Sequence, residues 1–407
     1  MFPLNKFKTI QTPFYYYDVE VLKQTLQNLM QESEKYGYMV HYALKANANN
    51  HILDIINSFN LGADCVSGNE VKKAVEHNFR SEHIVFAGVG KSDSEINCAL
   101  DNNIFCFNCE SLQELEVINE LAVAKNKTAR IALRINPNVN ANTHKYITTG
   151  LEENKFGINL WELETVVNGL KGFKNLQLIG LHFHIGSQIM DLNSFKSLCL
   201  RVNEIQNWFS IRQLFIKNIN VGGGFGVNYH EPDANLFPDF ASYFKLFNDF
   251  LELRPNQKVH FELGRSITAQ CGTLISKVLF IKKGVNTNFA ILDAGMTELM
   301  RPALYQAYHK IENLTKGKQE TRCKMQDARN KMQGARSQIS NLKSQIYKYD
   351  VVGPICESSD CFGKAVSLPE TKRGDIIAIR TAGAYGEVMS SGYNLRDKAK
   401  AIYSDEI

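Results

Sequence analysis

The sequence predicts an α/β fold in which a (β/α)8 barrel of the TIM type, residues 26–265, is followed by a C-terminal antiparallel β domain, residues 266–407. Three observations support this prediction. Eight short apolar runs alternate with segments of helical period before Glu262. After that residue, strand-like runs are separated by turns. The 407 residues leave room for a barrel of about 250 residues and a second domain.

The eight apolar runs have the length of buried parallel strands, four to eight residues each. They are 39–44, 62–66, 84–88, 104–107, 130–136, 178–185, 216–221 and 258–262. A longer segment that could form a helix follows each run but the last. A closed parallel barrel requires this rhythm of eight strands with helices between them.

Two of the intervening segments show the helical pattern clearly. In segment 193–209 the apolar residues share one face of a helix: Phe195, Leu198, Val202, Ile205, Trp208 and Phe209. In segment 111–122 the same holds for Leu112, Leu115, Ile118 and Leu121. A serine followed three residues later by a glutamate predicts a capping box at two helix starts, Ser67 with Glu70 and Ser111 with Glu114.

The β domain is predicted from four strand-like runs, 272–283, 288–295, 348–355 and 375–383. The aromatic run "TPFYYYD" near the start of the chain has the same character. We therefore expect the N-terminal segment, residues 1–25, to join this domain.

A basic insertion interrupts the β domain at residues 315–348. Apolar residues recur in it every seven positions, at Met325, Met332, Ile339 and Ile346. One unbroken helix of that length would separate chain ends that should lie close together. We expect either a helical hairpin broken at Gly334 or a partly disordered loop.

Composition excludes several classes of function. The net charge of +4 arises in segment 316–348, which holds nine basic and two acidic residues and leaves −3 for the rest, so no nucleic-acid surface is expected. With no long apolar stretch and no signal-peptide pattern, we expect a cytoplasmic protein that does not bind membranes. The nine cysteines are irregularly spaced, as in a reducing compartment, and the Cys106/Cys109 pair has no second pair to complete a zinc site.

Polar residues follow the apolar runs at several strand ends. The first, second and fifth runs lead to Lys45, Asp64 and Arg134, and the last three lead to "HFHIGSQ", "NVGGGFG" and "FELGR". The C-terminal strand ends of such a barrel form one face, on which active sites are built. A lysine at this face need not be buried unpaired, because it would look into a polar pocket.

Each of these motifs has more than one interpretation. His182 and His184 point to the same side of a strand, either as hydrogen-bonded core histidines or as zinc ligands, although a zinc site needs further ligands at other strand ends. The "GGGFG" loop does not fit the dinucleotide pattern, but its backbone N–H groups could approach an anion. Glu262 and Arg265 could form a surface ion pair, or bind a cationic ring nitrogen and an anion respectively.

Taken together, the motifs suit one cofactor. A lysine can bind an aldehyde covalently, a glycine loop can hold a phosphate, a histidine can stack on a ring, and a carboxylate can keep a pyridine nitrogen protonated. This combination suits pyridoxal 5'-phosphate (PLP).

Nine motifs also occur in the order found in one family: "TPFYYYD", "YALKAN", "LRINP", "HFHIGSQ", "GGGFG", "ELGR", "MRPALY", "GPICESSD" and "AGAYG". In these the chain resembles the fold-type III, alanine-racemase-like PLP-dependent decarboxylases, and within them the diaminopimelate decarboxylases. The resemblance implies a carboxy-lyase that converts meso-2,6-diaminopimelate to L-lysine and CO2, the last step of lysine biosynthesis. It also implies a homodimer with shared active sites.

The resemblance assigns roles by position. Lys45 would hold the cofactor covalently, His184 would stack on its ring and Glu262 would pair with its ring nitrogen. The remaining cofactor-binding residues, several of them expected at the phosphate, are Asp64, Arg134, Ser187, Gly223, Gly224, Gly264, Arg265 and Tyr385.

The substrate-binding residues implied in the same way are Arg265, Arg301, Tyr305, Glu357 and Tyr385. The arginines would hold the distal carboxylate, and Glu357 would receive the distal ammonium. Cys356 would donate a proton, and in this family it and Glu357 reach the pocket of the neighbouring subunit. The family usually has a proline where this chain has Leu263, and we expect little loss from that change.

Two alternatives remain open. A decarboxylase of the same fold could act on carboxynorspermidine, ornithine or arginine, although ornithine has no distal carboxylate for the arginines to bind. A non-catalytic PLP-binding protein would resemble the barrel alone and would have no use for the second domain.

Overall fold

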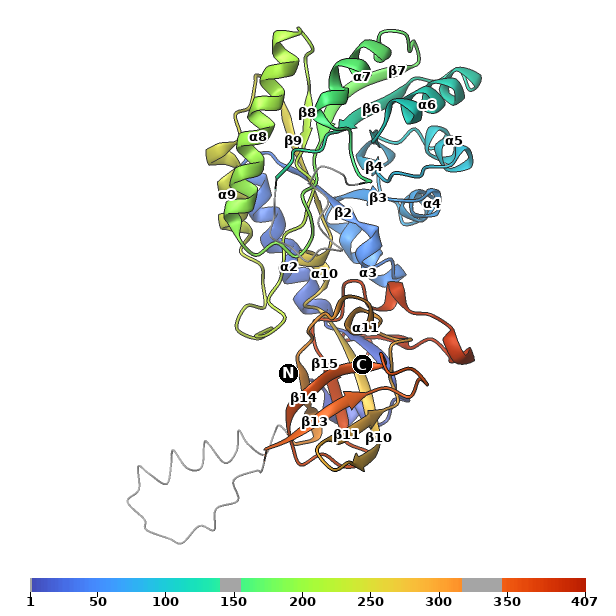
Figure 1. Cartoon of the computed structure of the whole chain (residues 1–407), viewed down its shortest axis with the longest axis vertical. Coiled ribbons are helices and arrows are strands. Elements are labelled where there is room, and N and C mark those ends of the chain that lie inside the picture. Colours follow the sequence, from blue (N-terminus) through green and yellow to red (C-terminus); the bar gives the residue numbers. More distant parts are fainter. Residues whose placement is uncertain (1, 140–154, 317–345) are drawn as a thin grey trace, which may run out of the picture. The chain divides into compact units, whose positions relative to one another are not determined.

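A computed structural model describes residues 2–139, 155–316 and 346–407 and divides into two compact units (Figure 1). The first, which we call the barrel unit, comprises Lys23–Val227 and Phe237–Ile267. The second, the β unit, comprises Met1–Leu22, Asn228–Leu236 and Thr268–Ile407.

The barrel unit contains a closed barrel of eight strands, and every neighbouring pair is parallel. The strands are β2 (Met39–Ala43), β3 (Gly62–Cys65), β4 (Ile84–Phe86), β5 (Cys106–Cys109), β6 (Ala129–Arg134), β7 (Leu176–His182), β8 (Asn218–Asn220) and β9 (Lys258–Leu263). Each predicted apolar run overlaps one of these strands, so the predicted barrel is confirmed.

Helices lie outside the strands of this barrel (Figure 1). They are α2 (Val19–Glu34), α3 (Asn50–Ser58), α4 (Gly68–Glu76), α5 (Asp93–Asp101), α6 (Leu112–Ala124), α7 (Leu163–Leu170), α8 (Leu192–Ile211), α9 (Phe240–Phe250) and α10 (Arg265–Thr268). The apolar face predicted on α8 is buried except at Trp208, which is half-buried under the Arg212 guanidinium 3.7 Å from its ring centroid.

Only half of each predicted capping box forms. Ser67 and Ser111 accept hydrogen bonds from the backbone N–H groups of Glu70 and Glu114, as predicted. The two glutamate carboxylates, however, bond the N–H group of the residue before each serine, at 2.7 Å in both cases. A glutamate side chain in the first turn can reach either N–H group, so the sequence pattern does not decide between them.

An aromatic cluster packs α8 and α9 against the barrel. Phe195, Tyr243, Phe247 and Phe261 are all fully buried. The Phe247 and Phe261 rings meet edge to face with centroids 4.9 Å apart, and Phe195 meets Tyr243 in the same way at 5.0 Å. Edge-to-face pairs add to the free energy of burial. The cluster therefore anchors β9, the strand that carries Glu262.

The β unit is an eight-stranded sheet whose main path runs β12-β15-β10-β11-β13-β14, with β1 joining β10 and β16. Its strands are β1 (Phe14–Tyr17), β10 (Gly272–Lys283), β11 (Asn288–Leu292), β12 (Ile311–Asn313), β13 (Ile346–Val352), β14 (Cys361–Pro369), β15 (Ile376–Ile379) and β16 (Lys400–Tyr403). The sheet is mostly antiparallel, as predicted, but two pairs, β1–β16 and β11–β13, are parallel. The short helices α1 (Leu4–Phe7) and α11 (Arg301–Tyr305) belong to the same unit.

The predicted insertion at 315–348 lies almost entirely outside the described residues, including Gly334 and all but the last of its heptad positions. Its final residues, from Ile346, are the first residues of β13. Among the helices of the described ranges, none is long and apolar enough to span a membrane.

The aromatic cluster yields a first prediction. Phe247→Ala should lower the free energy of unfolding by about 3–5 kcal/mol, because it removes a fully buried ring and leaves a cavity. Urea denaturation followed by circular dichroism measures the change. Phe215→Ala is the matched control, since 87% of that side chain's surface is exposed and its loss should change stability by less than about 0.5 kcal/mol. Equal shifts for the two variants would contradict the prediction.

Candidate active site

The first polar pair lies at the C-terminal ends of β2 and β3. Lys45 stands in a 3-10 turn, η1 (Leu44–Ala46), directly after β2, and its Nζ lies 2.9 Å from Oδ2 of Asp64. Asp64 is fully buried, whereas 36% of the Lys45 side chain is exposed. Burial, together with the charge of Glu262, raises the pKa of Asp64 to about 7 although Lys45 opposes the shift.

The other carboxylate oxygen of Asp64, Oδ1, is buried without a hydrogen-bond donor among the residues that the structure describes. A buried polar atom of this kind normally has a partner. Oδ1 of Asp64 could therefore accept a hydrogen bond from a donor bound beside the Lys45 amine.

A buried carboxylate, Glu262 on β9, lies at the centre of the barrel. It accepts hydrogen bonds from side chains on three other strands: Asn108 Nδ2 at 3.0 Å, Asn220 Nδ2 at 2.8 Å and His182 Nε2 at 3.0 Å. Burial alone would raise its pKa, but the charge and hydrogen bond of His182, with the charge of Lys45, hold the pKa of Glu262 well below its usual range. Glu262 is therefore held as a buried, ionised acid.

The sequence did not single out Asn108 or Asn220, and it left His182 as a core residue or a zinc ligand. A usable signal existed, because both asparagines interrupt apolar runs at positions where a barrel strand should carry an apolar side chain. His182 uses Nε2 to bond Glu262. In the described ranges, no group of three or more histidine, cysteine, aspartate or glutamate side chains is placed to hold a metal ion.

His184, two residues further on, provides a flat uncharged ring. Its Nδ1 accepts a hydrogen bond from the backbone N–H of Gly223 at 3.3 Å, which leaves the proton of the neutral ring on Nε2. Burial, then the charges of Arg134 and Lys45, hold the pKa of His184 well below its ordinary value. A neutral imidazole can stack on another ring without adding charge to it.

The glycine loop after β8 requires its glycines. Gly222 and Gly224 have φ angles of +72° and +100°, in the range that other residues rarely adopt. A Cβ on Gly223 would collide with the carbonyl oxygen of Glu262, and one on Gly224 with that of Gly186. The loop can therefore lie against its neighbours only with bare backbone, which suits the close approach of an anion.

Ser187 and Arg265 form a second anion-binding candidate in the same unit. Nη2 of Arg265, the first residue of α10, donates to the Ser187 hydroxyl at 3.0 Å. Arg265 is buried. Gly264 beside it packs against the turn of Lys45, since a Cβ there would lie 2.8 Å from Cβ of Ala46.

Arg134, at the end of β6, is already engaged by protein groups. Its Nη1 donates to Oε1 of Glu110 at 2.9 Å, and its guanidinium carbon lies 4.8 Å from the centroid of Phe156. Glu110 also accepts from the backbone N–H groups of Gly88 and Gly157. This buried pair joins three loops, and its predicted contact with a cofactor stays a prediction.

The groups of the barrel unit fit PLP. It offers one amine beside a buried acid, one neutral ring, one ionised carboxylate and bare backbone next to a serine and an arginine. These match the aldehyde, ring face, ring nitrogen and phosphate of the cofactor. Oδ1 of Asp64 adds an acceptor to which no donor of the described residues bonds.

The remaining predicted residues lie in the β unit. Arg301, the first residue of α11, is buried, and Nη1 donates to the Tyr229 hydroxyl at 3.0 Å and to His309 Nε2 at 2.9 Å. Tyr305, at the end of α11, is half-buried. Tyr385 has a φ of +57°, an uncommon backbone conformation for a tyrosine.

Cys356 and Glu357 lie in the loop between β13 and β14, and both are exposed. Glu357 accepts a hydrogen bond from the Tyr393 hydroxyl at 2.9 Å. The loop is organised by Asp360, whose carboxylate accepts from the backbone N–H groups of Met296 at 2.6 Å and Ile355 at 2.7 Å. Sequence reasoning gave Asp360 no role, although it closes the "CESSD" motif.

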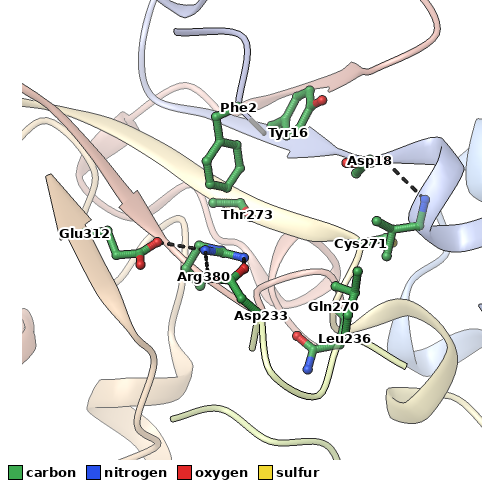
Figure 2. Close-up of a pocket in the computed structure, with 11 residues that line it drawn as sticks. Phe2, Tyr16, Asp18, Asp233, Leu236, Gln270, Cys271, Thr273, Glu312 and Arg380 are labelled. Carbon is green, nitrogen blue, oxygen red and sulfur yellow. Dashed lines mark hydrogen bonds and ion pairs between the residues drawn. The ribbon is translucent and has the colours of Figure 1, made fainter. Parts of the chain in front are cut away.

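A cavity of about 420 Å³ lies elsewhere in the β unit (Figure 2). Of the predicted site residues, none lines it. Three of its charged groups bind one another, with Arg380 donating to Asp233 at 2.6 Å and to Glu312 at 2.8 Å (Figure 2). Phe2 covers the Arg380 guanidinium with its ring. The charge of Arg380 is thus already paired with two acids of the cavity lining.

Comparison with known proteins agrees with the geometry of the barrel. Residues 20–269 match the family model described as pyridoxal-dependent decarboxylase, pyridoxal binding domain. Diaminopimelate decarboxylase of Bacteroides thetaiotaomicron is 54% identical over 100% of this chain and 99% of its own. The enzyme of the same name from Helicobacter pylori strain J99 is 39% identical over 96% of this chain and 90% of its own.

A solved structure extends the similarity to three dimensions. Helicobacter pylori diaminopimelate decarboxylase complexed with L-lysine superposes with a TM-score of 0.86 and 38% identity, covering 99% of this chain and 94% of that one. Identity at this level, over essentially the whole of both chains, leaves one conclusion. The chain belongs to the diaminopimelate decarboxylase family of pyridoxal-dependent decarboxylases.

Proposed function

We propose that this chain is a PLP-dependent carboxy-lyase that converts meso-2,6-diaminopimelate to L-lysine and CO2, the last step of lysine biosynthesis. The observation that carries the proposal is the ionised Glu262 inside the barrel that also presents the Lys45 amine. When bound, the cofactor supplies an electron sink for the electron pair left as the carbon–carboxylate bond breaks. The protein supplies orientation and electrostatics.

Three residues would act at the cofactor ring. Lys45 would hold the cofactor through Nζ until the substrate amine takes its place. Glu262 would accept a hydrogen bond from the protonated ring nitrogen, and its low pKa keeps it charged for that purpose. His184 would cover one face of the ring as a neutral imidazole.

The phosphate would be bound where bare backbone and hydroxyl groups are available. Gly224 would donate its backbone N–H group and Ser187 its hydroxyl, while Gly223, whose N–H bonds His184, would leave room for the phosphate to approach the backbone. Arg265 would supply positive charge close by, since it already bonds Ser187. Gly264 would keep this region packed against the Lys45 turn.

Substrate selection follows from charge. The distal end of diaminopimelate carries both a carboxylate and an ammonium, which suits Arg301 and Arg265 together with Glu357. Tyr305 and Tyr385 would complete that end of the pocket. Cys356 would deliver a proton to the carbon from which CO2 has left.

We further propose that the enzyme is a homodimer with shared active sites. Cys356 and Glu357 are exposed in a single chain, as expected of residues that serve a neighbouring subunit. We place the reaction in the cytoplasm, in keeping with the free thiols of all eight cysteines in the described ranges.

The competing functions can be separated by products. A decarboxylase for carboxynorspermidine, ornithine or arginine would release CO2 from those substrates in preference to diaminopimelate. A non-catalytic PLP carrier would release CO2 from none of them. An assay of CO2 and lysine formation across this panel tests the proposed function, and failure to form lysine from diaminopimelate would reject it.

Lys45→Ala should abolish both lysine formation and the visible absorbance of the bound cofactor, because the covalent bond to the amine is lost. Absorption spectra of the purified variant measure this directly. Lys35→Ala removes an exposed lysine that pairs with Glu32 on the surface, and it should leave both unchanged. A Lys45→Ala protein with the wild-type chromophore would refute the assignment.

Gly223→Ala should weaken PLP binding by about tenfold or more, since the added Cβ collides with the Glu262 carbonyl and displaces the loop. Titration of the apoprotein with PLP, followed by fluorescence, gives the Kd. Gly90→Ala is the control, because a Cβ there meets nothing within 4 Å. Unchanged affinity in Gly223→Ala would argue against a phosphate at this loop.

Mixing two inactive variants tests the shared site. Lys45→Ala and Cys356→Ala, unfolded and refolded together in equal amounts, should recover about a quarter of wild-type activity, because half of the random dimers contain one intact site. Each variant refolded alone should stay inactive. Absence of recovery in a mixture shown to contain hybrid dimers would contradict sharing.

A further inference from the structure

The β unit holds the Arg301 guanidinium in a way that the family assignment does not explain. Nη1 donates to the Tyr229 hydroxyl at 3.0 Å and to His309 Nε2 at 2.9 Å. The guanidinium carbon also lies 4.9 Å from the centroid of the Tyr229 ring. All three residues are buried, with 2–7% of their surface exposed.

The hydrogen-bond chain fixes the state of the histidine. Arginine can only donate, so Nε2 of His309 must accept and must carry no proton. The proton of the neutral ring is then on Nδ1, which donates to the carbonyl oxygen of Arg380 at 2.9 Å. His309 is thus held between Arg380, the residue after β15, and Arg301 of α11, and the Tyr229 ring packs against it at 83°.

Two neutral acceptors have a different effect from a carboxylate. An aspartate or glutamate in their place would orient Arg301 and cancel its charge as well. A phenol and an imidazole orient the guanidinium but leave its positive charge in place.

We propose that Tyr229 and His309 are positioning residues that fix the Arg301 guanidinium for the carboxylate at the far end of the substrate. The proposal rests on the function proposed above, in which Arg301 binds that carboxylate. It predicts that the loss of either acceptor weakens binding of ligands that carry the carboxylate and spares ligands that lack it.

Two substitutions at position 309 separate the two hydrogen bonds. In His309→Gln, Oε1 can replace Nε2 as the acceptor for Arg301. In His309→Asn, the side-chain amide can replace Nδ1 as the donor to Arg380, but no acceptor reaches Arg301. Tyr229→Phe keeps the ring beneath the guanidinium and removes only the hydroxyl.

We expect His309→Asn and Tyr229→Phe each to raise KM for diaminopimelate by about tenfold with kcat changed by less than about twofold, because a hydrogen bond to a charged group is lost and ground-state binding with it. His309→Gln should stay within about threefold of wild type. Melting temperature and the cofactor absorbance of each variant show whether the fold is intact.

Calorimetry with two ligands provides a readout that does not depend on turnover. L-Lysine carries the carboxylate, and 1,5-diaminopentane lacks it. His309→Asn and Tyr229→Phe should weaken lysine binding about tenfold and leave diaminopentane binding unchanged. Equal losses for both ligands, or no loss for lysine, would overturn the inference.

The two proposals can fail separately. If the wild type forms no lysine from diaminopimelate, the proposed function falls, while the contrast between lysine and diaminopentane still tests the role of the two residues. If the wild type forms lysine and the variants alter kcat rather than KM, the function stands and the positioning role is rejected.

Discussion

The ionised carboxylate of Glu262 buried inside a closed barrel is the constraint on which the rest of the site depends. An isolated buried charge would be too costly to keep, so the barrel surrounds it with donors from β5, β7 and β8. Closure of the sheet makes this possible, because it brings four strand ends from distant parts of the chain around one point. The aromatic cluster behind β9 then holds the strand that carries the acid.

The same interior shifts the pKa values of two acids in opposite directions. Asp64 has one carboxylate oxygen paired with Lys45 and the other without a donor in the described part of the chain, and burial raises its pKa. Glu262 has three donors, and its pKa is lowered. Burial raises the pKa of both acids, so the difference comes from their neighbours: the charge and hydrogen bond of His182 favour the ionised form of Glu262, whereas the charge of Glu262 disfavours that of Asp64. One acid can hold a positive ring nitrogen, while the other stays available beside the amine.

Much of this arrangement could be predicted from the sequence, for identifiable reasons. The barrel was predictable because its strands are short apolar runs with a regular spacing, and Lys45, Gly223 and Glu262 stand at their ends. The parallel pairing of β11 with β13 was not, because residues far apart in the chain form it. The second hydrogen bond of each capping box was also not predictable. Two backbone N–H groups compete for each glutamate carboxylate, and in both boxes the bond forms with the residue before the serine.

Residues that act through other residues were the hardest to foresee. Asn108 and Asn220 were visible as polar interruptions of apolar runs, yet nothing in the sequence pointed them at Glu262. Tyr229 and His309 lie 72 and 8 positions from Arg301 and meet it only through the fold. A pattern of residues identifies groups that touch a cofactor, whereas the groups that orient them depend on three-dimensional packing.

The ionisation of Glu262 can be tested by nuclear magnetic resonance of the protein loaded with PLP labelled with nitrogen-15 in its ring. If the acid is charged and faces the ring nitrogen, that nitrogen should be protonated at neutral pH in the wild type and lose its proton in Glu262→Gln. A neutral ring nitrogen in the wild type, with the cofactor bound, would contradict the account at its centre.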